Sequence, residues 1–164
     1  SILFFPRQKL EYTLTRSLPR LATADASVVS LKGGIVRIAV TERTPYALWC
    51  EQDECFLFDE HGFVFAPRRG DQLVRNEIFY SGMIHDDPTG TWFLPSYFED
   101  VMRTVAAVEN VGVDIASLEV LNEHEYRMKL KDGMLLLARF DSDSNTLAEN
   151  LKIALSSDML RDRL

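Results

Sequence analysis

The stretch from Thr41 to Ala66, TERTPYALWCEQDECFLFDEHGFVFA, determines how the rest of the chain is interpreted. Two short aromatic and aliphatic runs, Tyr46 to Glu51 and Cys55 to Asp59, have the composition of strands. The mostly acidic residues between them cannot be buried unpaired, so we expect a solvated hairpin loop there. A second turn at His61-Gly62 leads into a third run, Phe63 to Ala66. The stretch therefore predicts a three-stranded meander.

The charge of the chain changes sign near the start of this stretch. Residues 1–43 contain seven Lys or Arg and three Asp or Glu, a net charge of +4. Residues 44–164 contain eleven and twenty-two, a net charge of -11. Pro45 lacks a backbone donor and biases Thr44 toward extended geometry, which suits a connection between two sheets. We interpret the junction Arg43-Thr44-Pro45 as the boundary between a domain at 1–43 and a larger domain at 44–164.

The overall composition predicts a folded chain and excludes several classes of function. Hydrophobic residues make up 46% of the 164 residues and charged residues 26%, which is enough apolar material for a core and too little charge for general disorder. The acidic larger part argues against nucleic acid as a partner, since phosphate binding needs clustered Lys and Arg. No run reaches the roughly 20 apolar residues of a membrane helix. The chain begins on an apolar run without an initiator methionine, so we expect it to be part of a longer protein.

The first 43 residues predict one helix followed by one hairpin. Leucines recur every four residues at positions 10, 14 and 18, so an amphipathic helix is expected between Pro6 and Pro19. Strands are expected at 24–31 and 35–42, joined by a tight turn at Gly33-Gly34. Two strands and one helix bury little area, so a further strand is expected from upstream or from a neighbour.

The larger domain predicts a sheet with two helices. A short strand is expected at 78–80, a helix at about 95–109, strands at 113–121, 126–131 and 134–140, and a final helix from Ser144 to about Arg163. Met134 to Ala138 is almost continuously apolar and predicts a central strand. Ser144 or Asn145 is expected to cap the final helix. The fold class is therefore α+β, with a partial helix-hairpin module followed by a mostly antiparallel β domain.

Cys50 and Cys55 flank the four-residue loop of the first hairpin in the meander. A loop of this length could bring their Cβ atoms within range of a disulfide across the mouth of the hairpin. The alternative is a pair of thiols packed among aromatic side chains. The sequence leaves both interpretations open.

The other chemically notable residues do not form a recognisable catalytic or metal-binding motif. Cys50, Cys55, His61 and His85 lack the close pairing of zinc ligands. Asp141, Asp143 and Asn145 begin like a calcium-binding loop, but Thr146 and Lys152 stand where that loop needs Gly and Glu. Asp86-Asp87 precedes turn residues and is interpreted as a solvated turn. No nucleophile elbow, phosphate-binding loop or dinucleotide fingerprint occurs. We therefore expect a non-enzymatic protein with no cofactor and no metal.

Several segments together resemble the FtsQ/DivIB family of bacterial cell-division proteins: a helix ending in LPR, the hairpin ASVVSLKGGIVRIAVTER, and the segments TPYALW and FLFDEHGFVF. The resemblance is most specific from Ala24 to Ala66, in the ER-x-P-x-A-x-W spacing and the D-x-x-G-x-V-F turn. It implies that residues 1–43 are the C-terminal half of a POTRA domain and residues 44–164 a β domain lacking its last strand. It also implies a single membrane helix upstream and a location on the extracytoplasmic face of the cytoplasmic membrane, at the division septum.

The resemblance further implies a scaffold of the division machinery that binds FtsB/DivIC-like and FtsL-like partners and helps to regulate septal peptidoglycan synthesis. In that family the partner adds a strand at the edge formed by the last strand of the β domain. Leu160, Arg161 and Arg163 lie nearest to that strand in the sequence and are the expected partner contacts. An extracytoplasmic location would also permit a Cys50–Cys55 disulfide. The alternative is a POTRA-containing transport or outer-membrane assembly component, which would predict repeated modules; no repeat is visible in this sequence.

Overall fold

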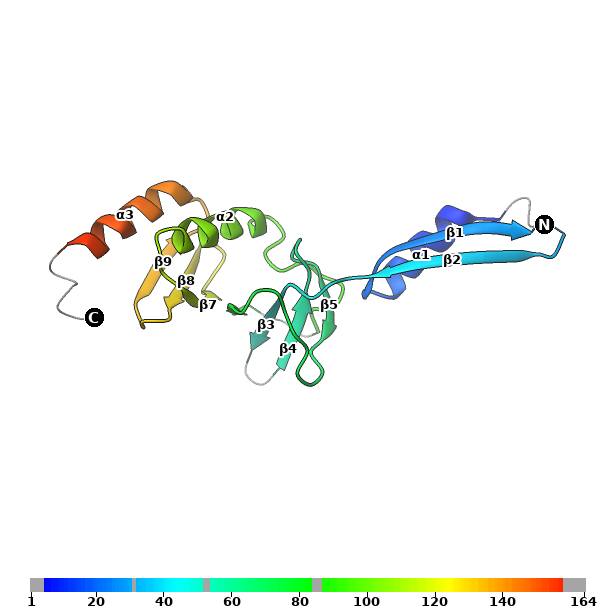
Figure 1. Ribbon diagram of the computed structural model, residues 1–164, viewed down its shortest axis with the longest axis horizontal. Helices are drawn as coiled ribbons and strands as arrows, with labels where there is room; N and C mark the ends of the chain where they lie inside the picture. Colours follow the sequence, from blue (N-terminus) through cyan, green and yellow to red (C-terminus); the bar gives the residue numbers. More distant parts are fainter. Residues whose placement is uncertain (1–4, 31, 52–53, 84–86, 158–164) are drawn as a thin grey trace.

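The computed structural model describes residues 5–30, 32–51, 54–83 and 87–157. Its helices and strands form an α+β fold with one two-stranded and one seven-stranded sheet, which confirms the predicted fold class. Figure 1 shows an elongated molecule in which the two-stranded sheet lies at one end and the last helix near the other. The strands on the two sides of residues 43–46 belong to different sheets.

The N-terminal unit, as we name the part before residue 44, consists of α1 (Arg7–Ser17), β1 (Leu21–Ser30) and β2 (Ile35–Glu42). The strands pair antiparallel, with Ala24 opposite Val40 and Ala26 opposite Ile38. Helix α1 packs on β1. Glu11 accepts a hydrogen bond from the backbone N–H of Ala26 at 2.8 Å, and Ala26 is fully buried. Hydrogen bonding thus fixes the helix to the hairpin, although α1 itself has no fully buried residue.

The sheet unit, as we name the part from β3 onward, is organised by its seven-stranded sheet. Its elements are β3 (Ala47–Glu51), β4 (Glu54–Phe58), β5 (Val64–Pro67), β6 (Phe79–Ser81), α2 (Phe98–Glu109), β7 (Ile115–Val120), β8 (Glu125–Leu130), β9 (Leu135–Arg139) and α3 (Ser144–Ser156). The strand order is β5-β4-β3-β6-β7-β8-β9. The predicted meander is β3-β4-β5, and all its pairs are antiparallel. The short β6 pairs parallel with both β3 and β7 and joins the meander to the C-terminal strands.

The main core lies between one face of this sheet and the helices α2 and α3. Phe58 lies at its centre and is fully buried. Its ring stacks on Phe93 at 5.3 Å between centroids and meets the rings of Tyr80 and Phe98 edge-on at 5.2 and 5.9 Å. Aromatic clusters of this kind bury large areas and prefer these offset and edge-to-face arrangements. A smaller cluster on the opposite face packs Leu48, Leu57, Phe65 and Ala66 under Val74.

Gly82 directly follows β6 and lies against the backbone of Val120 on β7. Its φ is +89°, and a Cβ atom built there would lie 2.1 Å from the carbonyl oxygen of Val120. Only glycine adopts this conformation without strain and leaves room for that oxygen. The carbonyl oxygen of Gly82 also accepts a hydrogen bond of 3.0 Å from Nε1 of Trp49, so one residue connects β3, β6 and β7.

Two expectations from the sequence are wrong. The apolar run from Met134 to Ala138 is not central among the described strands, because β9 lies at the end of their order and Leu135 and Leu137 are exposed. Asp143 caps α3, not Ser144 or Asn145, because the Asp143 carboxylate accepts the backbone N–H of Thr146 at 2.8 Å. The far end expected for that helix, near Arg163, lies outside the described residues.

Candidate functional site: an open strand edge

The outer edge of β9 is unpaired in the described part of the chain. The N–H of Leu130 donates to Met134 at 2.9 Å and that of Phe140 donates to His124 at 3.0 Å. In an antiparallel ladder the residues that bond to the neighbouring strand alternate. Residues 134, 136, 138 and 140 therefore bond to β8, and residues 135, 137 and 139 direct their N–H and C=O groups outward.

The outward-bonding residues of β9 also expose apolar side chains. Leu135 is 57% exposed and Leu137 is 63% exposed, on the sheet face that α2 and α3 do not cover. Their neighbours on β8 are Lys129, opposite Leu135, and Arg127, opposite Leu137. Arg127 pairs with Glu119 on β7. An unpaired edge with exposed leucines beside it is the arrangement that accepts an added strand.

The partner contacts expected from the sequence, Leu160, Arg161 and Arg163, lie outside the described residues. The described part of α3 ends at Ser156, after its buried residue Leu151.

A second uncovered surface lies on the hairpin of the N-terminal unit. One face of this hairpin is the face on which α1 packs. Three cross-strand pairs lie on it: Ala24 with Val40, Ala26 with Ile38, and Val28 with Val36. Ala26 is buried by α1, whereas Val28, Ile38 and Val40 are exposed. Half of this face is therefore an exposed aliphatic surface, and no helix or strand of the described residues packs on it.

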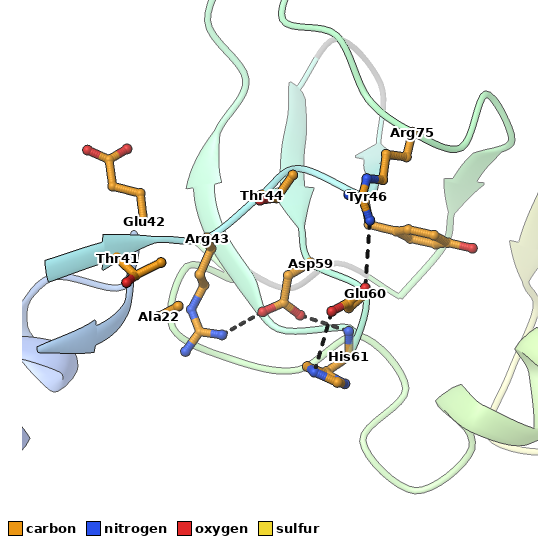
Figure 2. A pocket seen from close by; sticks show the side chains of 10 residues that line it. All are labelled: Ala22, Thr41, Glu42, Arg43, Thr44, Tyr46, Asp59, Glu60, His61 and Arg75. Atoms are coloured by element: carbon orange, nitrogen blue, oxygen red, sulfur yellow. Dashed lines mark hydrogen bonds and ion pairs between the residues drawn. The ribbon is translucent and has the colours of Figure 1, made fainter.

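The predicted junction Arg43, Thr44 and Pro45 lies between β2 and β3, next to a cavity of about 270 Å³. Figure 2 shows the residues around it, with the Arg43 side chain directed at Asp59. Arg43 Nη1 lies 2.5 Å from Asp59 Oδ2. Glu60 lies 3.9 Å from the ring of His61 and 3.8 Å from Arg75, which are weak surface contacts. The Arg43–Asp59 ion pair was not predicted from the sequence, because the two residues are sixteen positions apart.

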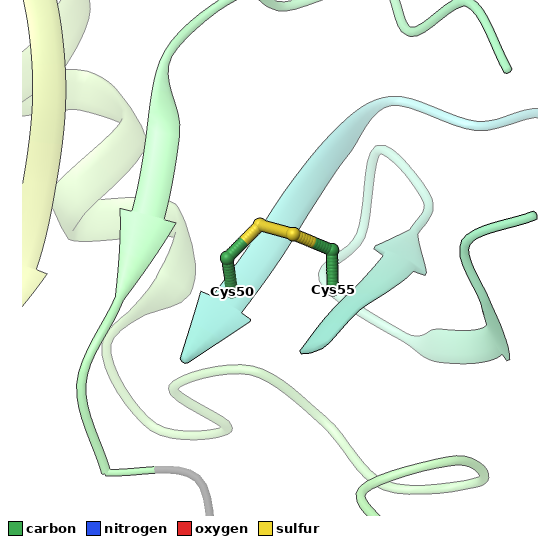
Figure 3. Close-up of a disulfide and its surroundings, with 2 residues drawn as sticks. All are labelled: Cys50 and Cys55. Carbon is green, nitrogen blue, oxygen red and sulfur yellow. A yellow bond between two sulfur atoms is a disulfide. The ribbon is translucent and has the colours of Figure 1, made fainter. Parts of the chain in front are cut away.

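Cys50 and Cys55 form a disulfide in the structure, the first of the two alternatives left open by the sequence. They are directly opposite each other on β3 and β4, and Figure 3 shows the bond crossing between these strands. Both residues are half-buried, beside the small cluster on the open face of the sheet. The bond therefore closes the hairpin on the side of the sheet away from the helices.

The titratable groups that show clear shifts have structural causes. Burial raises the pKa of the Tyr80 hydroxyl, which also accepts a hydrogen bond from Asn76 Nδ2 at 3.2 Å. The adjacent Thr89 side chain and the backbone N–H of Thr89, which donates to Asp87 Oδ1 at 2.9 Å, lower the pKa of Asp87. His85 and Asp86 lie outside the described residues. Within the described ranges, no three His, Cys, Asp or Glu residues lie close enough together to hold a metal ion.

None of the helices in the described part of the chain is long and apolar enough to cross a bilayer.

A scan against protein-family models gave no match to this chain, and a search of curated proteins gave none either.

Proposed function

We propose that this chain is part of an FtsQ/DivIB-like scaffold of the bacterial division machinery, which binds partner division proteins through strand addition to its seven-stranded sheet. The observation that supports this proposal most strongly is the open edge of β9. Main-chain N–H and C=O groups at residues 135, 137 and 139 would pair with the final strand that the family resemblance implies, and the exposed leucines would give that strand apolar contact.

The proposed partners are FtsB/DivIC-like and FtsL-like proteins on the extracytoplasmic side of the membrane. The family resemblance places a final strand after α3, and that strand would pair with β9 and present the next edge to the partner. In this proposal the sheet unit is the assembly platform and the N-terminal unit connects it to a membrane anchor that precedes it. The uncovered aliphatic surface of the hairpin is consistent with a POTRA domain whose other helix would cover it.

The scaffold needs no catalytic residue, and the arrangement at β9 supports binding instead of chemistry. We propose that its contribution to septal peptidoglycan synthesis is to position other proteins. The net charge of residues 44–164, -11, disfavours acidic polymers as partners of the sheet unit and favours protein partners.

The test is a pull-down with the soluble extracytoplasmic segment of the FtsB-like partner. The bait is this chain in two forms, as the 164 residues and extended at its C-terminus by the segment that follows in the full protein. Binding by the extended form alone, or by the extended form more strongly, supports strand addition at this end of the sheet. Binding by neither form contradicts the proposal and leaves only a resemblance at the level of fold.

A further inference from the structure

The connection between the two units is short, because the residues at its two ends are hydrogen-bonded to one unit or the other. The backbone N–H of Arg43 donates to the carbonyl oxygen of Arg20 at 2.8 Å, which fixes Arg43 to the N-terminal unit. The N–H of Tyr46 donates to the carbonyl oxygen of Phe58 at 2.8 Å, which fixes Tyr46 to the sheet unit. Only residues 44–45 lie between these two anchors, so the joint consists of two residues.

The side chain of Arg43 crosses this joint. Its Nε donates to the carbonyl oxygen of Pro19 at 3.1 Å, on the N-terminal unit. Its Nη1 donates to Asp59 Oδ2 at 2.5 Å, on the sheet unit. The guanidinium also lies over the ring of Phe63, 4.1 Å from the centroid. One side chain therefore contacts both units at the same time, which uses the planar fork of donors that Arg has and Lys lacks.

The acceptor on the sheet unit is held rigidly. Asp59 Oδ1 accepts the backbone N–H groups of His61 and Phe63, each at 3.0 Å, within the β4–β5 turn. Its side chain is only 8% exposed and that of Arg43 19% exposed. An ion pair at this depth is weakly screened, and removing one partner leaves a buried charge without compensation.

We propose that Arg43 is a latch that holds the N-terminal unit and the sheet unit in one relative orientation. Without it, the two residues of the joint leave the torsions of Thr44 and the ψ of Pro45 free to change the angle between the units. When Arg43 makes these contacts, the distance between the hairpin of the N-terminal unit and the edge strand β9 is fixed. Figure 1 shows these two elements toward opposite ends of the molecule. This inference rests on the contacts at the joint and does not depend on the proposed function.

The test is a distance measurement by pulsed electron spin resonance on the full chain. Spin labels are attached through Gln8→Cys on α1 and Lys129→Cys on β8, both at exposed positions, with the native disulfide left intact. We expect a single narrow distance distribution in the otherwise unchanged protein. In Arg43→Lys, which keeps the charge but loses the fork, we expect the distribution to become roughly twice as wide.

Arg43→Gln is the second variant, and it is expected to widen the distribution at least as much as Arg43→Lys. Arg37→Gln is the matched control, because Arg37 is an exposed arginine on β2, the strand that ends just before Arg43, and its loss is expected to leave the distribution narrow. Near-ultraviolet circular dichroism of each variant verifies that the sheet unit remains folded. A narrow, unshifted distribution in both folded Arg43 variants would overturn the proposal, whatever the outcome of the partner pull-down.

Discussion

Cys50 on β3 and Cys55 on β4 are directly opposite each other, with their Cα atoms 4.1 Å apart, and a disulfide joins them across the hairpin. The bond lies near the loop end of the β3–β4 hairpin and closes a loop of few residues. By the entropy of loop closure, a bridge of this length stabilises a protein by about 2 kcal/mol. Reduction is therefore expected to lower the free energy of unfolding in urea by about that amount. The double variant Cys50→Ala/Cys55→Ala is the control, and its stability should not respond to reductant.

Gly82 is expected to be the glycine least tolerant of substitution. Gly82→Ala combines a positive φ with a Cβ atom 2.1 Å from the carbonyl oxygen of Val120, so strands β6 and β7 must separate. We expect a loss of about 3 kcal/mol or more in the free energy of unfolding. Gly133→Ala is a matched control, since Gly133 has a φ of +93° with no heavy atom near the added Cβ, and it should cost about 1 kcal/mol. Equal losses in the two variants would show that the close approach at Gly82 has no energetic effect.

Phe58 is expected to contribute more to stability than any exposed aromatic residue of the sheet. Phe58→Ala leaves a cavity among Phe93, Tyr80 and Phe98 and should lower the free energy of unfolding by about 4 kcal/mol. Phe79→Ala removes the same side chain from a position that is 53% exposed, so its cost should stay within about 1 kcal/mol. Chemical denaturation of both variants measures the difference, and similar costs would contradict the described packing.

Asp143 is expected to make stability depend on acid pH. The backbone N–H of Thr146, and then its hydroxyl, lower the pKa of Asp143 from the ordinary 3.8 because both donate to the carboxylate. A lowered pKa means that the capping contribution is present above the unfolded-state value and disappears as the pH falls through the folded-state value.

The measurement is a series of urea unfolding curves between about pH 5 and about pH 2, monitored by the far-ultraviolet circular dichroism signal of the helices. Asp143→Asn keeps a capping side chain that does not titrate, so its stability should fall less over this range than that of the unchanged protein. The remaining fall in the variant comes from other carboxylates, such as Asp141 beside Arg139. Identical acid profiles for the two proteins would rule out the cap as a titrating contributor.

Local signals in the sequence predicted most of the elements correctly. The meander around Cys50 and Cys55 follows from short aromatic and aliphatic runs separated by turn residues, and the strand at 126–131 was expected where β8 lies. The positions of these strands and turns depend on residues that are adjacent in the sequence, so the sequence alone is enough to predict them.

Features that depend on pairing between distant segments were predicted poorly. The run Met134 to Ala138 is apolar on both faces, and the sequence does not show that one of those faces is exposed at a sheet edge. The three-residue strand β6 pairs parallel with β3 and β7, and long-range parallel pairing leaves almost no local trace. For the Arg43–Asp59 pair, the available signal was an arginine beside the Pro45 joint and an aspartate that begins the D-x-x-G turn.

The central claim is that the outer edge of β9 receives the chain's own final strand, whose outer edge then receives the partner's strand in the assembled complex. The most direct measurement is amide hydrogen exchange at Leu137, compared between the 164-residue chain alone and the C-terminally extended chain saturated with the FtsB-like segment. The inward-bonded amide of Leu136 provides the internal control and should exchange slowly in both samples. We predict that the Leu137 amide exchanges rapidly in the chain alone and becomes protected in the complex. Rapid exchange of the Leu137 amide in the saturated complex would contradict the claim.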